Sequence, residues 1–375
     1  MRLVRLWLSD FRCYHELDLS LPAGFTVVMG GNGQGKTSLL EAVAWIATAR
    51  SFRGVPDAAL VREGAANAIV RAELERDGRE QLVEVEINPT GRNRMLVNRQ
   101  HVSRRRELTS ALRVTVFSPD DLDLVKGGPG ERRRYLDELL VTIAPRYDVA
   151  RAEYERVLRH RNALLRGGVR TGEERDTLAV FDEQLVQAGG ELVRGRLRLT
   201  SRLTPVVADA YRALASDDAG IDAAYVGEWA EGPVGPDVTG TEAAGVVEER
   251  LRDALGAHRR QELDRGMTLV GPHRDEWRLR VDGLDARTHA SQGEQRTLAL
   301  ALRLGGHRVG ADVIGEEPVL LLDDVFSELD PERARALVAE LPEGQTLLTT
   351  AGVVPAAVHP ERRLRVHAAK LEEER

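Results

Sequence analysis

Residues 30 to 37 read GGNGQGKT, a run whose residue types suit the binding of a phosphate group. Gly30, Gly35, Lys36 and Thr37 fit the spacing G-x-x-x-x-G-K-[ST], in which backbone N–H groups and a lysine hold phosphates and a hydroxyl faces Mg²⁺. The flanking runs FTVVMG and TSLLEAVAWIATA are typical of a strand and a helix. This context predicts a nucleotide-binding P-loop rather than a simple glycine-rich turn.

A second run whose residue types could take part in catalysis, VLLLDD, occupies residues 319 to 324. The apolar residues after Pro318 predict a buried central strand that ends in two carboxylates. Beside a P-loop, Asp323 would hold Mg²⁺ through water, and Asp324 would orient or deprotonate the attacking water. The alternative is a pair of solvated acids at a strand end.

A third run, SQGEQR at residues 291 to 296, opens a stretch that is typical of a helix, TLALALRLGGHRV. A hydroxyl, a glycine N–H and the positive end of a helix form an anion site of the same kind as a P-loop. The alternative is a helix cap in which Glu294 closes a capping box. After the two acids comes SELD, residues 327 to 330, and Pro331 then suits a first helical turn.

The remaining patterns predict how these three runs are positioned. RLVRLWLSDF is an apolar run typical of a strand, and QLVEVEINP and RMLVNRQHV are rich in β-formers and predict an antiparallel sheet that flanks the first helix. Residues 131–166 and 177–215 have helical periodicity with few breakers, which predicts two or more long amphipathic helices. Residues 216–241 are expected to form an irregular connection around a short strand in IDAAYVGEW. An α/β architecture at both ends therefore surrounds a helical middle.

Length and composition limit the number of domains, the compartment and the disulfides that can be expected of this protein. Its 375 residues, 42% of them hydrophobic, are enough for two domains or one large domain with an insertion. No apolar run approaches the roughly 18 to 20 residues of a membrane span, and the N-terminus lacks the pattern of a signal peptide, so we expect a cytoplasmic protein without a membrane partner. The single cysteine, Cys13, excludes an internal disulfide and is expected to be a small buried apolar residue.

Charge is distributed unevenly along the chain. The net charge is −7, yet Lys and Arg exceed Asp and Glu by eight between Gly91 and Arg170. Such asymmetry indicates a surface that faces a polyanion, although a solvated helical surface is the alternative. The candidates for contacts with DNA phosphates are two arginine triplets, Arg104, Arg105, Arg106 and Arg132, Arg133, Arg134.

The order of P-loop, SQGEQ, LLLDD and SELD resembles the ABC-type ATPases, and the long helical insertion resembles their SMC-like branch. Within that branch, LSDFRCYHELDLSL, FSPDDLDLVKGGPGERRRYLDELL and GMTLVGPHRDEW resemble the RecF family of bacterial recombination and repair ATPases. The resemblance implies an α/β fold, an ABC-type P-loop ATPase head built from both ends of the chain, with a mainly helical inserted lid subdomain. The expected divisions are an N-terminal lobe at 1–118, the insertion at 119–265 and a C-terminal lobe at 266–375.

The same resemblance implies a function and partners. We expect ATP and Mg²⁺ as cofactors and ATP-dependent homodimerisation. Slow, DNA-stimulated hydrolysis would control binding to single-stranded DNA, gapped duplex or junctions of single and double strands. Recombinase loading through mediator proteins of the RecO and RecR type, and association with the nucleoid, follow from the resemblance as well.

The resemblance also assigns site residues. Lys36, Asp323 and Asp324 would act in catalysis. Thr37 and Asp323 would hold Mg²⁺, and Asp330 would lie in a loop facing the second subunit. The P-loop would comprise Gly30, Gly31, Asn32, Gly33, Gln34, Gly35, Lys36, Thr37 and Ser38. The signature that completes the second subunit's nucleotide site would comprise Ser291, Gln292, Gly293, Glu294 and Gln295.

The chain departs from the wider superfamily in three places. Asp324 stands where a longer glutamate is usual, and Thr349 and Thr350 stand where a switch histidine is expected. FSPDDL lies at the place of the Gln-loop but lacks a glutamine. The first two departures favour slow turnover.

Other candidates carry weaker signals. Arg12 and Tyr14 are placed to approach adenine, and Arg50 and Arg53 to reach a phosphate, with an ordinary surface role as the alternative for each. In GPHRD, Gly and Pro constrain the turn around His273 and Arg274, and His273 is as compatible with a structural role as with a functional one.

Two other function classes compete with a DNA-dependent ATPase. An ABC transport cassette is disfavoured because 255 positions separate Lys36 from Ser291, whereas such cassettes keep the two motifs much closer. A P-loop kinase is disfavoured because SQGEQ and SELD have no place in it.

Overall fold

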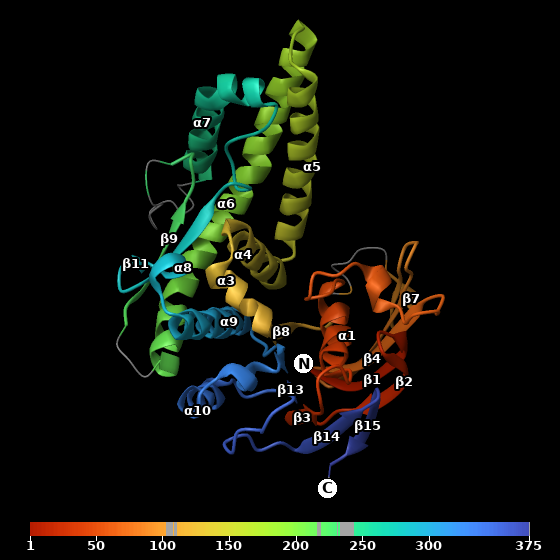
Figure 1. Cartoon of the computed structure of the whole chain (residues 1–375). Helices are drawn as coiled ribbons and strands as arrows, with labels where there is room; N and C mark the ends of the chain where they lie inside the picture. The colour runs from red at the N-terminus through yellow and green to blue at the C-terminus, as the bar shows by residue number, and fades with distance from the viewer. Residues whose placement is uncertain (103–107, 109–110, 216–218, 231, 233–243, 375) are drawn as a thin grey trace. The chain divides into compact units, whose positions relative to one another are not determined.

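The computed structural model describes residues 1–102, 108, 111–215, 219–230, 232 and 244–374 (Figure 1). The chain forms two compact units, and each contains segments that are distant in sequence. The first unit comprises Met1–Asp121, Ala213–Ala215 and Gly310–Arg375. The second unit comprises Leu122–Arg212 and Ser216–Val309.

One sheet of the first unit is antiparallel, as the sequence predicts. Alternation of buried and exposed residues along β4 is typical of a strand with one face on a core. Its six strands, in spatial order, are β2 (Tyr14–Ser20), β1 (Arg2–Phe11), β4 (Ala68–Arg76), β5 (Arg79–Ile87), β6 (Arg94–Val97) and β7 (Gln100–His101).

The other sheet of the first unit is mainly parallel. All five residues of β12 and of β13 are buried, because a parallel strand in the middle of a sheet is covered on both faces. Its six strands, in spatial order, are β15 (Lys370–Glu373), β14 (Arg362–His367), β3 (Phe25–Met29), β13 (Thr346–Thr350), β12 (Val319–Asp323) and β8 (Val114–Phe117). Strands from both ends of the chain therefore meet in one sheet.

Helix α1 (Lys36–Thr48) contacts strands of both sheets and is buried on most sides. Its side chains join those of the two sheets in one hydrophobic core. Helix α10 (Pro331–Glu340) and single 3₁₀ turns at Asp57–Leu60, Pro119–Leu122 and Val325–Glu328 complete the unit.

The second unit is mainly helical and carries a small antiparallel sheet. The sheet has the order β11 (Leu284–Asp285), β10 (Glu276–Val281) and β9 (Ile221–Val226), and β9 confirms the short strand predicted in IDAAYVGEW. The helices are α3 (Asp123–Lys126), α4 (Pro129–Ile143), α5 (Arg146–Gly167), α6 (Gly172–Ala215), α7 (Ala244–Arg265), α8 (Ala286–His289) and α9 (Gln292–Ile314).

A buried arginine connects the three long helices of the second unit. Arg161 on α5 is fully buried and donates to Asp182 of α6 at 2.8 Å and to Glu262 of α7 at 2.5 Å. Burial of a guanidinium is costly unless it is paired and hydrogen-bonded, and Thr268 supplies a third acceptor at 2.7 Å. The helices are thus held together by polar as well as apolar contacts.

The division into units differs from the expected one at residues 266–309. The expected C-terminal lobe includes this segment, whereas it belongs to the second unit. The physical reason is close packing of α9: a Cβ added at Gly305 would lie 2.7 Å from Val207 of α6, and one added at Gly306 would lie 2.5 Å from the hydroxyl of Tyr135. That hydroxyl donates to the carbonyl of Leu302 at 2.6 Å. Within the described residues, no helix is long and apolar enough to span a bilayer.

Candidate nucleotide site

The P-loop occupies the turn between β3 and α1, as predicted. Gly35 has φ of +113°, a conformation that side-chain-bearing residues rarely adopt. A Cβ there would also lie 2.8 Å from Cys13 Sγ and 3.0 Å from the Tyr14 hydroxyl. At the other end of the loop, a Cβ on Gly30 would lie 2.5 Å from the carbonyl oxygen of Val366. Glycine is therefore required at both positions by backbone geometry and close neighbours.

Lys36 is the first residue of α1, and its side chain folds back over the loop. Its Nζ donates to the carbonyls of Gly30 at 2.8 Å and Gly31 at 2.9 Å. The ammonium group is therefore held beside the loop whose N–H groups, with the positive end of α1, favour an anion.

Asp323 lies at the end of β12 and meets α1 across 286 positions of sequence. Its Oδ1 accepts from Thr37 Oγ1 at 2.9 Å and from Thr349 Oγ1 at 2.7 Å. Burial raises the pKa of the Asp323 carboxyl, and the two hydroxyl hydrogen bonds oppose the rise. A hard cation at this carboxylate would offset the cost of its burial, and carboxylate and hydroxyl oxygens are ligands that Mg²⁺ prefers. Thr37 and Asp323 therefore fit the magnesium role assigned to them.

Asp324 is held beside Asp323 by its backbone and its side chain. Its N–H donates to the Thr349 carbonyl at 3.0 Å, and its Oδ1 accepts from the Ala351 N–H at 3.2 Å. Its φ of +51° lies in the left-handed region, which aspartate adopts more readily than most residues. This backbone conformation provides a physical reason for Asp rather than Glu at the position.

Three contacts around the loop are not predictable from the sequence. Thr349, which the sequence indicates only as the replacement of a switch histidine, orients Asp323. Gln34 accepts through Oε1 from the Ala368 N–H at 2.7 Å, which ties the P-loop to the β14–β15 turn. Tyr14 is buried, and its hydroxyl donates to the Gly35 carbonyl at 3.1 Å. It therefore stabilises the loop from the core side and is not placed to contact adenine. Isolated hydroxyl and amide side chains give no periodic signal that would reveal these contacts.

Arg12 is engaged within the first unit. Its guanidinium donates to Glu41 of α1 at 2.7 and 2.9 Å and to the Ala59 carbonyl at 2.9 Å. The expectation that Arg12 approaches adenine is therefore not favoured by its placement. Of the two phosphate candidates nearby, the charge of Arg53 acts on Asp323, where it lowers the carboxyl pKa against the larger effect of burial. Cys13 is exposed, which corrects the expectation of a buried residue.

The signature run begins helix α9 and forms a capping box. The Ser291 N–H donates to Glu294 Oε2 at 2.6 Å, and the Glu294 N–H donates to Ser291 Oγ at 3.3 Å. Gln295 is buried and donates to the carbonyls of Ala286 and Arg287, each at 3.1 Å. The cap that the sequence offers as an alternative is present, and the role of this run across a dimer stays a prediction.

Asp330 likewise caps a helix. It accepts from the backbone N–H groups of Glu332 at 3.0 Å and Arg333 at 2.9 Å, at the start of α10. These hydrogen bonds lower the pKa of the Asp330 carboxyl. Its place in a dimer-facing loop stays a prediction.

The Arg132 side chain is not exposed, whereas a side chain that binds DNA phosphates must be. It is buried and pairs with Glu276 at 2.7 Å, and it also donates to the carbonyls of Leu124, Val125 and Gly127. The placement corrects the interpretation of this residue as a DNA contact. Its guanidinium instead joins α3 and α4 to β10.

The other arginines of the triplets have different surroundings. Arg133 is half-buried and donates to the Asp275 carbonyl at 2.7 Å, whereas Arg134 is exposed and pairs with Glu131. Arg104, Arg105 and Arg106 lie outside the described residues.

His273 is held in a structural network of the second unit. Its Nδ1 lies 2.6 Å from the Tyr154 hydroxyl, and its Nε2 lies 3.3 Å from the Thr268 carbonyl. Burial lowers the pKa of the His273 imidazole to about 4, so the ring is neutral at pH 7. These contacts favour the structural role among the two that the sequence leaves open.

The strand, loop and helix around Lys36, with Asp323 and Asp324 at the end of β12 in the same sheet, define a P-loop ATPase head of the ABC type. The family described as the RecF/RecN/SMC N terminal domain matches residues 2–350. An Smc head domain derived from Pyrococcus furiosus has the same fold, with a TM-score of 0.56 at 15% identity over 99% of this chain and 95% of that one.

Other similarities are much closer. The DNA replication and repair protein RecF of Kineococcus radiotolerans is 44% identical over 98% of this chain and 97% of its own length. That of Frankia alni is 48% identical over 94% of this chain and 93% of its own. A solved structure described as the recombination mediator protein RecF-ATP in the RecFOR pathway superposes with a TM-score of 0.89, at 27% identity over 100% of this chain and 99% of that one. The chain belongs to the RecF family, and nothing in these similarities supports a transport cassette.

Proposed function

We propose that this chain is a DNA-binding ATPase of replication and recombinational repair, in which ATP closes a homodimer and slow hydrolysis reopens it. The observation that carries the proposal is the convergence of Thr37, which follows Lys36 in the P-loop, and Thr349 on Asp323, an arrangement that suits a nucleotide with Mg²⁺. The relatives named as DNA replication and repair proteins, and a separate solved structure described as RecF-ATP, support the choice of substrate and process.

The residues of the first unit suit the steps of hydrolysis. The loop N–H groups and Lys36 hold the β- and γ-phosphates, and Mg²⁺ held by Thr37 and Asp323 would neutralise part of their charge. Asp324, next to these groups, orients the attacking water and accepts its proton. Ser291 and Gly293 of the partner subunit complete the γ-phosphate contacts.

The DNA substrate is a gapped duplex or a junction of single and double strands, and mediators of the RecO and RecR type load a recombinase there. Arg104, Arg105, Arg106 and Arg134 are the phosphate contacts in this proposal. Arg132 is left out because it is buried, and Arg133 because its guanidinium bonds within the second unit.

DNA binding should depend on both nucleotide and salt. We expect ATP to strengthen binding to a gapped duplex at least about tenfold over ADP, because only the closed dimer presents both subunits' basic residues to one duplex. Fluorescence anisotropy over a salt series measures affinity and the slope of log K against log salt. Replacing Arg104, Arg105 and Arg106 together by alanine should lower the slope by up to about three. Equal affinity with ATP and ADP would contradict the proposal.

Replacing Asp324 by asparagine should separate binding from turnover. The amide keeps the shape of the side chain and tolerates the left-handed backbone, but it cannot accept a proton. We expect unchanged ATP binding, a hydrolysis rate lower by about 10²-fold or more, and a dimer that persists with ATP in size-exclusion chromatography. Hydrolysis at the parental rate would show that Asp324 is not the base.

A further inference from the structure

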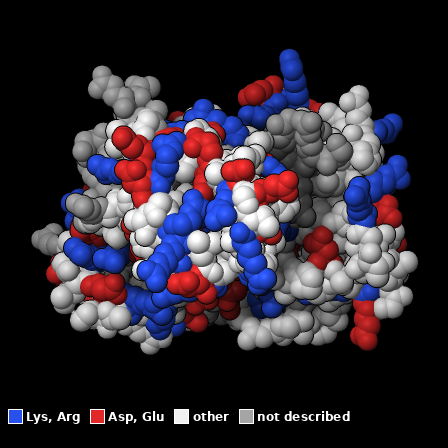
Figure 2. All heavy atoms as spheres, turned by 90° about the horizontal axis from the view of Figure 1, so that it is seen from above, with Lys and Arg blue, Asp and Glu red and all other residues white. Residues whose placement is uncertain are grey.

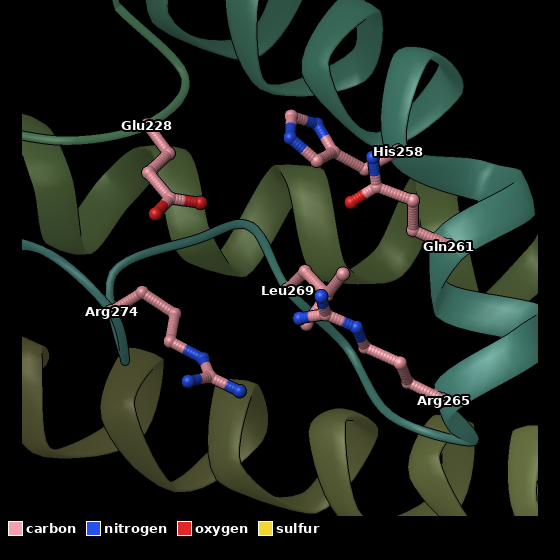
Figure 3. A pocket seen from close by; sticks show the side chains of 6 residues that line it. All are labelled: Glu228, His258, Gln261, Arg265, Leu269 and Arg274. Atoms are coloured by element: carbon pink, nitrogen blue, oxygen red, sulfur yellow. The ribbon is translucent and has the colours of Figure 1, made fainter.

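A cavity of about 470 Å³ lies on the second unit, away from the elements of the nucleotide site in sequence. It is lined by Glu228, His258, Gln261, Arg265, Leu269 and Arg274 (Figure 3). Three of these come from one face of α7, because His258, Gln261 and Arg265 follow one another at spacings of three and four. Arg274 and Leu269 come from the segment 266–275 between α7 and β10. The cavity therefore has a helix as one wall and a non-regular segment as its floor.

The two arginines reach toward the cavity from opposite sides (Figure 3). Within the described residues, the side chains of Arg265 and Gln261 make no hydrogen bond or ion pair. In the described part of the chain, the Arg274 side chain has two long contacts, at 3.4 Å to the Thr268 carbonyl and 3.9 Å to Met267 Sδ. Each guanidinium carries five N–H donors, so most of the donors around the cavity remain open to a ligand.

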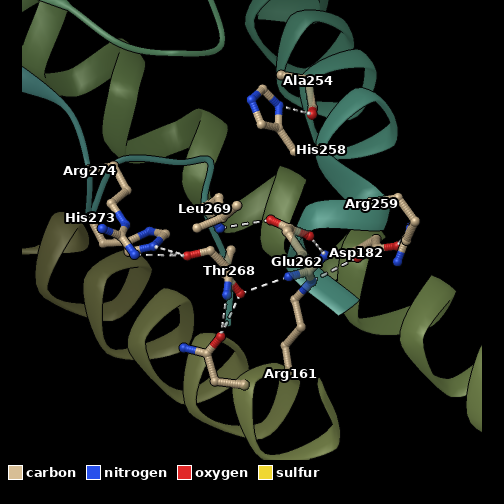
Figure 4. Close-up of polar contacts among 11 residues, drawn as sticks. Arg161, Asp182, Ala254, His258, Arg259, Glu262, Thr268, Leu269, His273 and Arg274 are labelled. Carbon is tan, nitrogen blue, oxygen red and sulfur yellow. Dashed lines mark hydrogen bonds and ion pairs between the residues drawn. The ribbon is translucent and has the colours of Figure 1, made fainter. Parts of the chain in front are cut away.

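The floor of the cavity is fixed from beneath by buried hydrogen bonds (Figure 4). The Leu269 N–H donates to Glu262 at 2.8 Å, and Glu262 is itself paired with the buried Arg161. Thr268 is bound to the side-chain oxygen of Asn162 through both its N–H and its hydroxyl, each at 2.7 Å. A segment anchored in this way presents Arg274 from a pre-organised backbone, which lowers the entropic cost of binding.

This cavity is distinguished by the positions of two arginine side chains and not by a large positively charged surface. On the face seen from above, Lys and Arg side chains are interspersed with Asp and Glu (Figure 2). At the cavity, two guanidinium groups converge and Glu228 pairs with neither of them. Planar guanidinium forks match the tetrahedral oxygens of phosphate, and an amide such as Gln261 adds a neutral donor.

We propose that this cavity binds a phosphate group between the guanidinium groups of Arg265 and Arg274. Its volume exceeds that of a bare phosphate, and the mostly buried Leu269 contributes a small apolar part of the lining. The phosphate belongs either to the backbone of single-stranded DNA or to a free nucleotide. If the phosphate comes from DNA, the inference rests on the DNA-binding function proposed above. If it comes from a free nucleotide, the inference is independent of that function.

The test compares a double variant of the cavity with a matched control. Arg265→Gln with Arg274→Gln removes two charges from the cavity, and Arg250→Gln with Arg260→Gln removes two from exposed α7 positions that do not line it. Thermal unfolding of both variants checks that these exposed changes leave the fold intact. The probes are inorganic phosphate, thymidine monophosphate and a thymidine oligonucleotide, titrated at several salt concentrations in the presence of saturating ATP so that the P-loop is filled.

With DNA as the source, the cavity variant weakens oligonucleotide binding roughly tenfold and lowers the salt slope by about two, while the control changes it less. With a free nucleotide as the source, thymidine monophosphate and phosphate binding are lost in the cavity variant while oligonucleotide binding matches the control. If the parent protein binds no oligonucleotide, the proposed function fails, yet the two small probes still test the cavity. Equal behaviour of the cavity and control variants with all three probes would overturn the inference.

Discussion

Replacing Lys36 by alanine is expected to lower ATP affinity at least about a hundredfold and to remove ATP-stimulated DNA binding at the same time. The Lys36 ammonium is held 2.8 and 2.9 Å from two loop carbonyls, at the start of α1. Charge-assisted hydrogen bonds contribute about 1.5–3 kcal/mol each, and Lys36 is expected to donate one to each of the β- and γ-phosphates, so its loss would remove about 3–6 kcal/mol of binding energy. A hundredfold loss corresponds to about 2.8 kcal/mol, just below this range, so it is the smallest effect expected.

Isothermal titration with ATP and anisotropy with gapped DNA measure the two effects on the same preparations. Lys126→Ala is the matched control, because Lys126 is an exposed lysine of the second unit and its loss should leave ATP affinity unchanged. Near-UV circular dichroism shows whether the loop and the core beneath it remain folded. ATP-dependent DNA binding that survives in Lys36→Ala would remove the basis for the P-loop assignment.

The nucleotide site of the first unit could be predicted because its residues are constrained by backbone geometry. Only glycine fits the positive φ and close neighbours of Gly35, and only an apolar run fits a strand buried on both faces such as β12. Such requirements leave a pattern in the sequence. The hydroxyl of Thr349 does not, because a threonine on a strand has the same signature whether it packs or orients Asp323.

The triplet of Arg132, Arg133 and Arg134 shows a second limit of prediction from the sequence. In a linear sequence, Arg132, Arg133 and Arg134 look like one cationic patch, but on α4 they point in different directions around the helix. Arg132 shares a face with Tyr135 and Leu136, three and four residues later, and all three are buried. The spacing of the apolar residues along the helix therefore distinguishes Arg132 from Arg134, whereas the count of charges does not.

The segment 266–309 packs within the second unit, although its motifs place it with the P-loop in the expected division. Its motifs belong with the P-loop in the ATPase chemistry, whereas its packing is decided by Gly305 and Gly306, which allow α9 to approach α6 and α4. Glycines within a helix give no indication of which helix they will face. The order of the motifs therefore predicts the chemistry of this segment better than it predicts which elements the segment packs against.

Mixing two inactive variants should restore ATP hydrolysis if the signature run acts across a dimer. A Ser291→Arg subunit keeps its P-loop but cannot complete its partner's site, and a Lys36→Ala subunit has the reverse defect. Each homodimer then carries two damaged sites. A heterodimer carries one doubly damaged site and one intact site, because a two-fold dimer exchanges equivalent surfaces.

The rate should be measured against mixing ratio at fixed total protein. With free subunit exchange, equal amounts give about half heterodimers and hence about a quarter of the parental number of intact sites, which sets the height of the maximum. Ser291 also caps α9 through Glu294, and loss of an N-cap costs about 0.5–2 kcal/mol, so stability needs its own control. Glu294→Gln weakens the same capping box while leaving the Ser291 hydroxyl in place.

If Glu294→Gln mixed with Lys36→Ala follows the same curve as Ser291→Arg mixed with Lys36→Ala, the effect belongs to the cap rather than to Ser291. The expected result is that Glu294→Gln, which keeps a side-chain oxygen able to accept from the Ser291 N–H, retains hydrolysis without mixing, whereas Ser291→Arg is inactive until it is mixed. That difference places the requirement on the Ser291 hydroxyl, because both variants disturb the start of α9 but only one blocks the anion site. A flat, inactive mixing profile despite heterodimers seen by native mass spectrometry would mean that the signature run acts within its own chain or only caps a helix.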